Sequence, residues 1–229
     1  MLRPMLRPIV VLAAALSLAA GGAAALAGGS PPPVIRAAVV FAGSPAALDT
    51  AVFAGGCFWG VEAVFEHVRG VADVVSGYAG GDPSKATYRQ VSSGATGNAE
   101  SVRVVYDPSQ VSYQELLRVF FLVAHDPTQK DRQGPDVGPQ YRSAIFYAGE
   151  EQREEALAAI AELERARAFK RPIATQVAPL AGFHAAEAYH QDYAAHHPND
   201  VYIVINDRPK VERLRRDFPQ LWRDRRAGG

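Results

Sequence analysis

The chain contains very little sulfur. Cys57 is the only cysteine among 229 residues, so no intramolecular disulfide can form and the hydrophobic core must supply the stability. The only methionines are Met1 and Met5, so the rest of the chain offers oxidants no thioether to attack. This composition suits an oxidising environment in which a single thiol is available for chemistry.

The chain has no excess of charge of either sign. Its 24 Lys and Arg residues balance 24 Asp and Glu residues. Proteins that bind nucleic acid usually carry a strongly basic face. The segment 210–226 is locally basic, but acidic residues alternate within it, which is typical of a solvated helix. We therefore expect no nucleic-acid partner.

A long hydrophobic run is also missing, because the apolar segment 9–20 is shorter than the roughly 20 residues that span a bilayer. Arg3 and Arg7 precede this segment, and the small residues Ala25-Leu26-Ala27 follow it. This pattern predicts a signal peptide over 1–27 and export, to the periplasm. The alternative is a membrane anchor formed by residues 9–27. Without Arg3 and Arg7, 22 basic residues face 24 acidic ones, a net charge of −2.

The remainder of the chain predicts one α+β domain. Residues 28–49 are rich in Gly, Ser and Pro and are interpreted as a linker. Over 50–229, strand patterns alternate with helix patterns, which favours helices packed on a sheet in two layers. Ser112 and Glu115 form a capping-box signature for one helix. The other expected elements are strands over 50–54, 74–79, 101–106, 143–147 and 173–177, a loop over 128–140, and a helix over 150–167 with Leu157, Ile160 and Leu163 inward.

The most informative segment is Gly55-Gly56-Cys57-Phe58-Trp59-Gly60, which lies where a strand pattern changes to a helix pattern. Cys57 is therefore expected near a helix N-terminus. There, the unpaired backbone N–H groups and the helix dipole favour an anion, and we expect the pKa of the thiol to be lowered. The glycines allow a sharp turn, and Phe58 and Trp59 provide an apolar wall beside the sulfur.

Three other interpretations of Cys57 remain. A single cysteine can be an inert, buried hydrophobic residue of a binding module. A Cys-His hydrolase would pair Cys57 with His184 or His190, although no hydrolase signature surrounds the cysteine. A metal site is not indicated, because the six histidines show no ligand spacing with Cys57.

Several segments together resemble the A-type peptide methionine sulfoxide reductases, from about residue 50 to at least residue 221. The resemblance implies a two-layer, ferredoxin-like α/β sandwich with the active site at one edge of the sheet, and a monomer. The matching segments are Gly56-Cys57-Phe58-Trp59-Gly60, Gly77-Tyr78-Ala79-Gly80-Gly81, Thr96-Gly97-Asn98-Ala99-Glu100, His125-Asp126-Pro127-Thr128, Asp131-Arg132-Gln133-Gly134 and Gln140-Tyr141-Arg142-Ser143.

The resemblance also implies roles for individual residues. Cys57 would attack the sulfoxide sulfur, and Glu100 would donate a proton to the sulfoxide oxygen, which otherwise leaves poorly. Tyr88 and Tyr141 would hold that oxygen, and Asp136 would belong to the surrounding hydrogen-bond network. Each has a plainer alternative: a solvated carboxylate for Glu100, tyrosines at the edge of the core, and a turn cap for Asp136.

By the same resemblance, Phe58 and Trp59 would receive the methyl group of the substrate. The implied substrates are the S epimer of methionine sulfoxide in oxidised proteins and the free amino acid, and no cofactor is implied. Asn98 replaces the histidine usual in the family. The second cysteine of many relatives is also missing, so we expect an external thiol, a thioredoxin-like protein or a small thiol, to reduce the oxidised Cys57.

Overall fold

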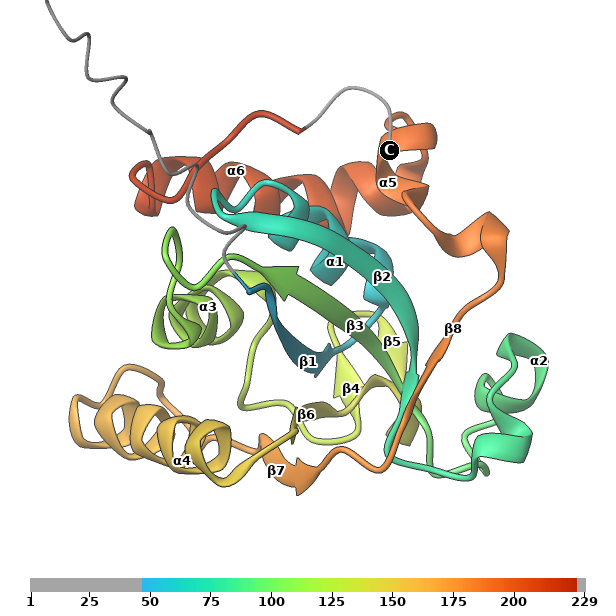
Figure 1. The fold of residues 1–229 in the computed structure, drawn as a ribbon. Coiled ribbons are helices and arrows are strands. Elements are labelled where there is room, and N and C mark those ends of the chain that lie inside the picture. Colours follow the sequence, from blue (N-terminus) through green and yellow to red (C-terminus); the bar gives the residue numbers. More distant parts are fainter. Residues whose placement is uncertain (1–46, 226–229) are drawn as a thin grey trace, which may run out of the picture. The chain divides into compact units, whose positions relative to one another are not determined.

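The computed structural model describes residues 47–225, which fold around a six-stranded mixed sheet with the strand order β7-β6-β1-β3-β2-β8 (Figure 1). The expected signal peptide over 1–27 lies outside the described residues, as do all but the last three residues of the expected linker. The strands of the sheet are β1 (Asp49–Gly55), β2 (Val71–Ala79), β3 (Ala99–Tyr106), β6 (Ser143–Tyr147), β7 (Gln176–Pro179) and β8 (Phe183–Ala185).

The described residues also form six α-helices, which pack around this sheet. They are α1 (Phe58–Glu66), α2 (Tyr88–Val91), α3 (Tyr113–Val119), α4 (Glu150–Arg165), α5 (Tyr193–His196) and α6 (Arg208–Asp217). All neighbouring strands of the sheet are antiparallel except β6 and β7, which pair in parallel. With α1 after β1 and α3 after β3, these elements follow the β-α-β-β-α-β order of ferredoxin-like folds. The expectation of an α+β fold is confirmed.

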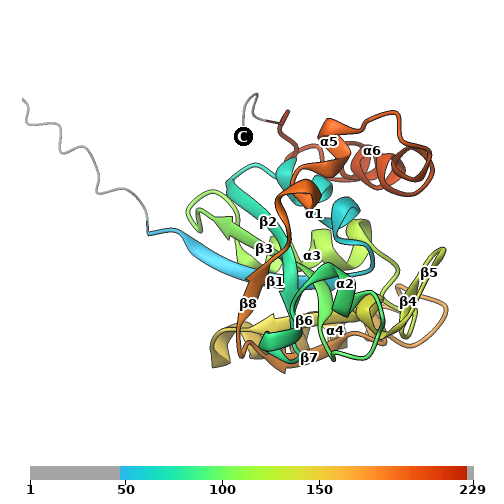
Figure 2. The ribbon, with the colours of Figure 1, turned by 90° about the vertical axis from the view of Figure 1, so that its right-hand side faces the viewer.

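The two faces of β1 pack against different clusters. Phe53 belongs to the large core, where its ring stacks on those of Phe65 in α1 and Phe120 after α3, with centroids 5.2 and 4.9 Å apart. Val52 and Ala54 point to the opposite face and join a small cluster formed by strand residues and by Ala178, Leu180 and Phe183. Figure 2 shows α1 and α3 on the same side of the sheet. The sheet is thus covered by helices on the face that forms the main core.

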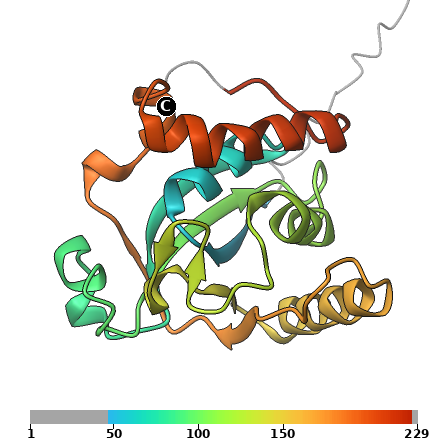
Figure 3. The ribbon, with the colours of Figure 1, turned by 180° about the vertical axis from the view of Figure 1, so that it is seen from behind.

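Several local expectations are confirmed by the backbone. Ser112 caps α3, with its Oγ accepting the N–H of Glu115 at 3.2 Å and the Glu115 carboxylate accepting the N–H of Ser112 at 2.8 Å. After α3 the chain continues as a π-helical turn (Phe120–Ala124) and stops at His125, where the sequence predicts the helix end. A π-helical turn (Ile203–Asp207) also precedes α6, and Figure 3 shows α6 crossing in front of α1.

Three local expectations are wrong. The last expected strand begins at Gln176 instead of Ile173, because the N–H of Ala174 bonds to Pro127 O and pairing with β6 starts only at Gln176. Leu157 is 42% exposed, because the buried face of α4 contains the preceding residue, Ala156, and the next residue along a helix points in a different direction. The expected loop over 128–140 contains a short hairpin of β4 (Arg132–Gln133) and β5 (Asp136–Val137).

Within residues 47–225, no helix is long and apolar enough to cross a membrane.

Candidate active site

Cys57 lies at the N-terminus of α1, directly after β1, as the sequence predicts. It is the N-cap residue of the helix, and its thiol is free and only 8% exposed. Gly56 makes the turn between strand and helix with φ of +93°, a conformation that side-chain-bearing residues rarely adopt. A Cβ at Gly56 would overlap the side chain of Gln133 from β4. The turn therefore requires glycine both for its backbone conformation and for the close approach of the hairpin.

The expected lowering of the Cys57 pKa is wrong for this structure. Burial raises the pKa of the thiol well above its ordinary value, and the nearby carboxyl groups of Glu100 and Asp207 raise it further. A hydrogen bond from the backbone N–H of Trp59 and the charge of Lys210 favour the thiolate, but they are weaker. The helix N-terminus is present, yet the loss of hydration outweighs its effect. The resting cysteine is therefore a protonated thiol at neutral pH.

Glu100 extends from β3, the strand next to β1, toward the start of α1. Its Oε2 accepts a hydrogen bond from the backbone N–H of Phe58 at 3.1 Å, and the residue is 3% exposed. Burial raises the pKa of the Glu100 carboxyl to about 8, the Phe58 hydrogen bond opposes this rise, and the charge of Asp136 adds to it. Glu100 is thus a carboxylic acid at neutral pH. It is hydrogen-bonded to the residue that follows Cys57, so it can donate a proton close to the thiol.

Tyr88, Tyr141 and Asp136 lie around the same two groups. Burial raises the pKa of the Tyr141 hydroxyl, and the charges of Glu100, Asp136 and Cys57 raise it further. Burial, Glu100 and Cys57 act in the same way on the pKa of Tyr88. Both hydroxyls therefore stay protonated and can donate hydrogen bonds. The structure brings these five residues together, although they come from five different segments of the chain.

Phe58 and Trp59 form an aromatic wall beside the cysteine. The Trp59 ring stacks on Tyr193 of α5 with centroids 3.7 Å apart and planes 9° apart, and its Nε1–H donates to His190 Nδ1 at 3.2 Å. Phe58 is buried, with its ring 5.0 Å from that of His190. Both expected pocket residues are therefore held in place by C-terminal aromatic residues.

Comparison with known proteins identifies the family. A model of the family described as peptide methionine sulfoxide reductase matches residues 49–221. This chain belongs to that family. A peptide methionine sulfoxide reductase MsrA 2 from Synechocystis is 53% identical over 170 residues, which cover 74% of this chain and 79% of that protein. A peptide methionine sulfoxide reductase MsrA from Thermus thermophilus is 51% identical over 175 residues, 76% of this chain and 98% of that protein.

Two solved structures support the same assignment. Mxr1 from Saccharomyces cerevisiae in reduced form superimposes with a TM-score of 0.62 at 34% identity, covering 69% of this chain and 90% of that one. Methionine sulfoxide reductase A of Corynebacterium diphtheriae gives a TM-score of 0.59 at 38% identity, covering 69% and 78%. The chain is therefore a methionine sulfoxide reductase of the A type.

Some residues that shape the active site of this reductase were not predicted from the sequence. The hydroxyl of Tyr202 donates a hydrogen bond to Asp136 Oδ2, and the Tyr202 ring meets Trp59 edge-on with centroids 6.0 Å apart. His190 was expected only as the base of a hydrolase, but its Nδ1 is occupied by the Trp59 N–H. The aromatic residues around His190 and Tyr193 were the one signal in the sequence that could have pointed to this role.

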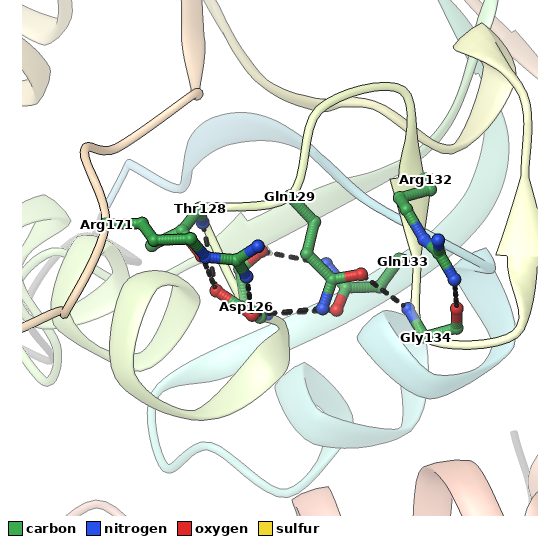
Figure 4. A network of polar contacts seen from close by, with 7 residues as sticks. All are labelled: Asp126, Thr128, Gln129, Arg132, Gln133, Gly134 and Arg171. Atoms are coloured by element: carbon green, nitrogen blue, oxygen red, sulfur yellow. Dashed lines mark hydrogen bonds and ion pairs between the residues drawn. The ribbon is translucent and has the colours of Figure 1, made fainter.

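The loop of the reductase that carries Asp136 is held by a polar network (Figure 4). The Gln133 amide bonds to both backbone groups of Asp126, its Oε1 accepting at 3.1 Å and its Nε2 donating at 3.0 Å. The Asp126 carboxylate in turn accepts hydrogen bonds from Thr128 and Gln129 and pairs with Arg171. The network fixes the hairpin, which carries both Gln133 and Asp136, against Gly56 next to the cysteine.

Asn98, which replaces the usual family histidine, has a structural contact of its own in this reductase. Its Oδ1 accepts the N–H of Gly81 at 3.2 Å, and its Nδ2 donates to Asp82 O at 2.8 Å. The substitution therefore ties the loop after β2 to the start of β3 and leaves Glu100 in place. Among residues 47–225, no three His, Cys, Asp or Glu side chains are arranged to hold a metal ion.

Proposed function

We propose that this methionine sulfoxide reductase acts on the S epimer of the sulfoxide, in oxidised proteins and as the free amino acid, with Cys57 as nucleophile and Glu100 as proton donor. The observation that carries the proposal is the pairing of a buried thiol with a buried carboxylic acid that the Phe58 N–H holds beside it. Cys57 supplies the sulfur nucleophile, and Glu100 supplies the proton that the departing oxygen requires.

Atoms and electrons balance in the proposed step. The Cys57 thiolate forms a bond to the sulfoxide sulfur while Glu100 transfers its proton to the sulfoxide oxygen. The sulfur–oxygen bond of the substrate then breaks and the hydroxyl passes to the cysteine sulfur, while the new sulfur–sulfur bond breaks and returns its electron pair to the substrate sulfur. The products are a thioether and a Cys57 sulfenic acid, so the substrate is reduced by two electrons and the cysteine is oxidised by two. The proton lost by the thiol on ionisation replaces the proton that Glu100 donated.

The raised pKa of Cys57 makes bound substrate part of the activation. A sulfoxide carries partial positive charge on sulfur, and that charge favours the thiolate once the substrate sulfur lies beside it. In the proposed complex, Tyr88 and Tyr141, which both stay protonated, donate hydrogen bonds to the negative sulfoxide oxygen. The thiol therefore ionises in the complex and keeps its proton in the free enzyme.

The same pocket predicts stereoselectivity. With the oxygen held by the tyrosines and the methyl group against Phe58 and Trp59, only one configuration leaves the electrophilic sulfur open to attack by Cys57. A racemic mixture of a methionine sulfoxide peptide should therefore be consumed to one half, with the R epimer left over, as chiral chromatography of the remaining substrate will show. A methyl pocket alone discriminates by about 1–3 kcal/mol, so the hydrogen bonds to oxygen must supply the rest. Similar consumption of both epimers would contradict this pocket.

The single cysteine predicts that turnover stops after one cycle without a donor. Cys57 is the only thiol, so no second cysteine in the chain can condense with its sulfenic acid. Reduced protein mixed with excess substrate should release about one product per chain, gain one oxygen in intact mass and bind dimedone at Cys57. A small thiol or a thioredoxin-like protein should restore turnover. Continued cycling without a donor, or a disulfide-linked dimer that dimedone does not label, would contradict external reduction.

We also propose export, on the basis of the charged, apolar and small-residue order of residues 3–27. Expression of the full chain followed by cell fractionation and N-terminal sequencing tests this proposal. A mature protein that begins after Ala27 in the periplasm supports a cleaved signal, whereas an intact N-terminus in the membrane supports an anchor.

A further inference from the structure

A buried ion pair lies against the first turn of α1, one helical turn after the nucleophilic cysteine. Lys210 Nζ is 3.0 Å from Asp207 Oδ1, and the Asp207 side chain is fully buried while that of Lys210 is 17% exposed. Both side chains pack on Gly60: a Cβ there would overlap Asp207 Oδ1 and lie 2.7 Å from Lys210 Nζ. Residues three positions apart share a helix face, so the pair lies on the side of α1 that carries Cys57.

The Asp207 carboxyl is costly to bury in this way. Its Oδ2 is buried and has no hydrogen-bond partner among the described residues, and Lys210 is the one cation paired with the group. Buried ion pairs commonly contribute little or nothing to stability compared with apolar residues of the same volume. Asp207 also ends a π-helical turn, a backbone feature that is frequent at functional sites. Stability alone therefore does not explain the pair.

The pair and Glu100 act on Cys57 from different elements of the fold. The carboxyl groups of Glu100, from β3, and Asp207, from the π-helical turn, disfavour the thiolate, and the ammonium of Lys210, from α6, favours it. Burial lowers the pKa of His125, which lies against Gly55, and the charge of Lys210 lowers it further, so this charge also reaches the turn that precedes Cys57. Burial raises the pKa of Asp207 itself. The charge of Lys210 lowers this pKa, and the charges of Asp136 and Asp200 raise it.

We propose that Asp207 and Lys210 are positioning residues that set the acidity of the Cys57 thiol: Lys210 stabilises the attacking thiolate, and Asp207 holds the ammonium beneath Gly60 and limits that stabilisation in the free enzyme. The absence of a side chain at Gly60 is what allows the pair to approach the helix. This inference rests on the proposed function, in which Cys57 attacks as a thiolate.

The test is a titration of the thiolate by its absorbance at 240 nm, with Cys57→Ser as the blank. Because the chain has one cysteine, the difference reports Cys57 alone. Lys210→Gln should raise the Cys57 pKa, so that iodoacetamide reacts roughly tenfold more slowly at pH 8. Asp207→Asn, which keeps the shape and the acceptor oxygen, should lower the pKa and accelerate alkylation by a similar factor. Lys210→Arg keeps the charge and should titrate like the wild type.

Activity provides a second, separate measurement. Single-turnover reduction of methionine sulfoxide by Lys210→Gln should slow roughly tenfold at pH 7 with little change in the substrate concentration for half-maximal rate. Opposite shifts of the thiolate titration in Lys210→Gln and Asp207→Asn support the inference. Unchanged titrations, or shifts in the same direction, in variants that keep the circular dichroism spectrum of the wild type overturn it. The titration does not depend on reductase activity, so it is decided separately from the proposed function.

Removal of one partner of a buried pair can prevent folding. If a single variant does not fold, the double variant Asp207→Asn/Lys210→Gln, which leaves no uncompensated charge, is titrated in its place. Asp207 affects the thiol more strongly than Lys210 does, so the double variant should form its thiolate at lower pH than the wild type. An unchanged titration of the folded double variant also overturns the inference.

Discussion

Replacement of Cys57 by serine should abolish reduction of methionine sulfoxide. A serine hydroxyl is less acidic and less polarisable than a thiol, and the buried site already disfavours an anion at this position. Single-turnover assays that separate methionine from its sulfoxide measure the effect, and the residual rate should equal that of the buffer alone. Because serine and cysteine are similar in size, the variant should keep the circular dichroism spectrum of the wild type.

A binding measurement separates lost chemistry from a lost pocket. Trp59 borders the site, so quenching of its fluorescence by a methionine sulfoxide peptide should persist in Cys57→Ser. The second tryptophan, Trp222, pairs with Val68 beyond the other end of α1 and can be replaced by phenylalanine to leave Trp59 as the only reporter. Measurable turnover by the serine variant would exclude Cys57 as the nucleophile.

Glu100→Gln should slow the chemical step by about 10²- to 10⁴-fold at pH 7, because glutamine keeps the shape and the acceptor for the Phe58 N–H but cannot give up a proton in the same way. The pH dependence follows from the pKa of about 8 for Glu100. The proton donor is present below this pH, so the wild-type rate should fall as the pH rises through about 8. The glutamine variant should lack that decline.

The matched control is Glu164→Gln, an exposed position on α4 at which the same change of side chain should leave the rate unaltered. An equal rate for Glu100→Gln and the wild type at pH 7 would show that the carboxyl takes no part in catalysis.

Stability provides an independent readout of the same group. The pKa of Glu100 in the folded protein, about 8, is higher than the value near 4.3 expected for an unfolded chain. The folded state therefore holds a proton that the unfolded state has lost between these pH values, and wild-type stability decreases as the pH rises through this window. The loss is on the order of a few kcal/mol and is complete above about pH 8. Urea unfolding at pH 9 should accordingly find Glu100→Gln more stable than the wild type.

Local signals predicted the position of Cys57 in the fold. The strand pattern, the two glycines and the helix pattern around Cys57 suffice to place it at a helix N-terminus, and the capping box of Ser112 indicated the start of α3. Both features depend on residues close together in the chain. The same is true of the strand Ser143–Tyr147, which the sequence predicts with the observed bounds.

Properties that depend on distant residues were not predictable in this way. The Cys57 pKa is raised because the tertiary fold removes water and brings Glu100 and Asp207 to the thiol from later parts of the chain. Tyr202 joins the site only because the chain after α5 returns across α1. No spacing rule links these positions, so sequence reasoning could locate Cys57 but not the environment that controls its pKa.

A buried thiol that keeps its proton also protects this reductase from the compounds that oxidise methionine. Hydrogen peroxide attacks thiolates far faster than thiols, and Cys57 in the free protein is both protonated and buried. The sulfur of the free protein is therefore slow to react with peroxide. A methionine sulfoxide reductase of this kind loses little of its single thiol to side reactions with oxidants.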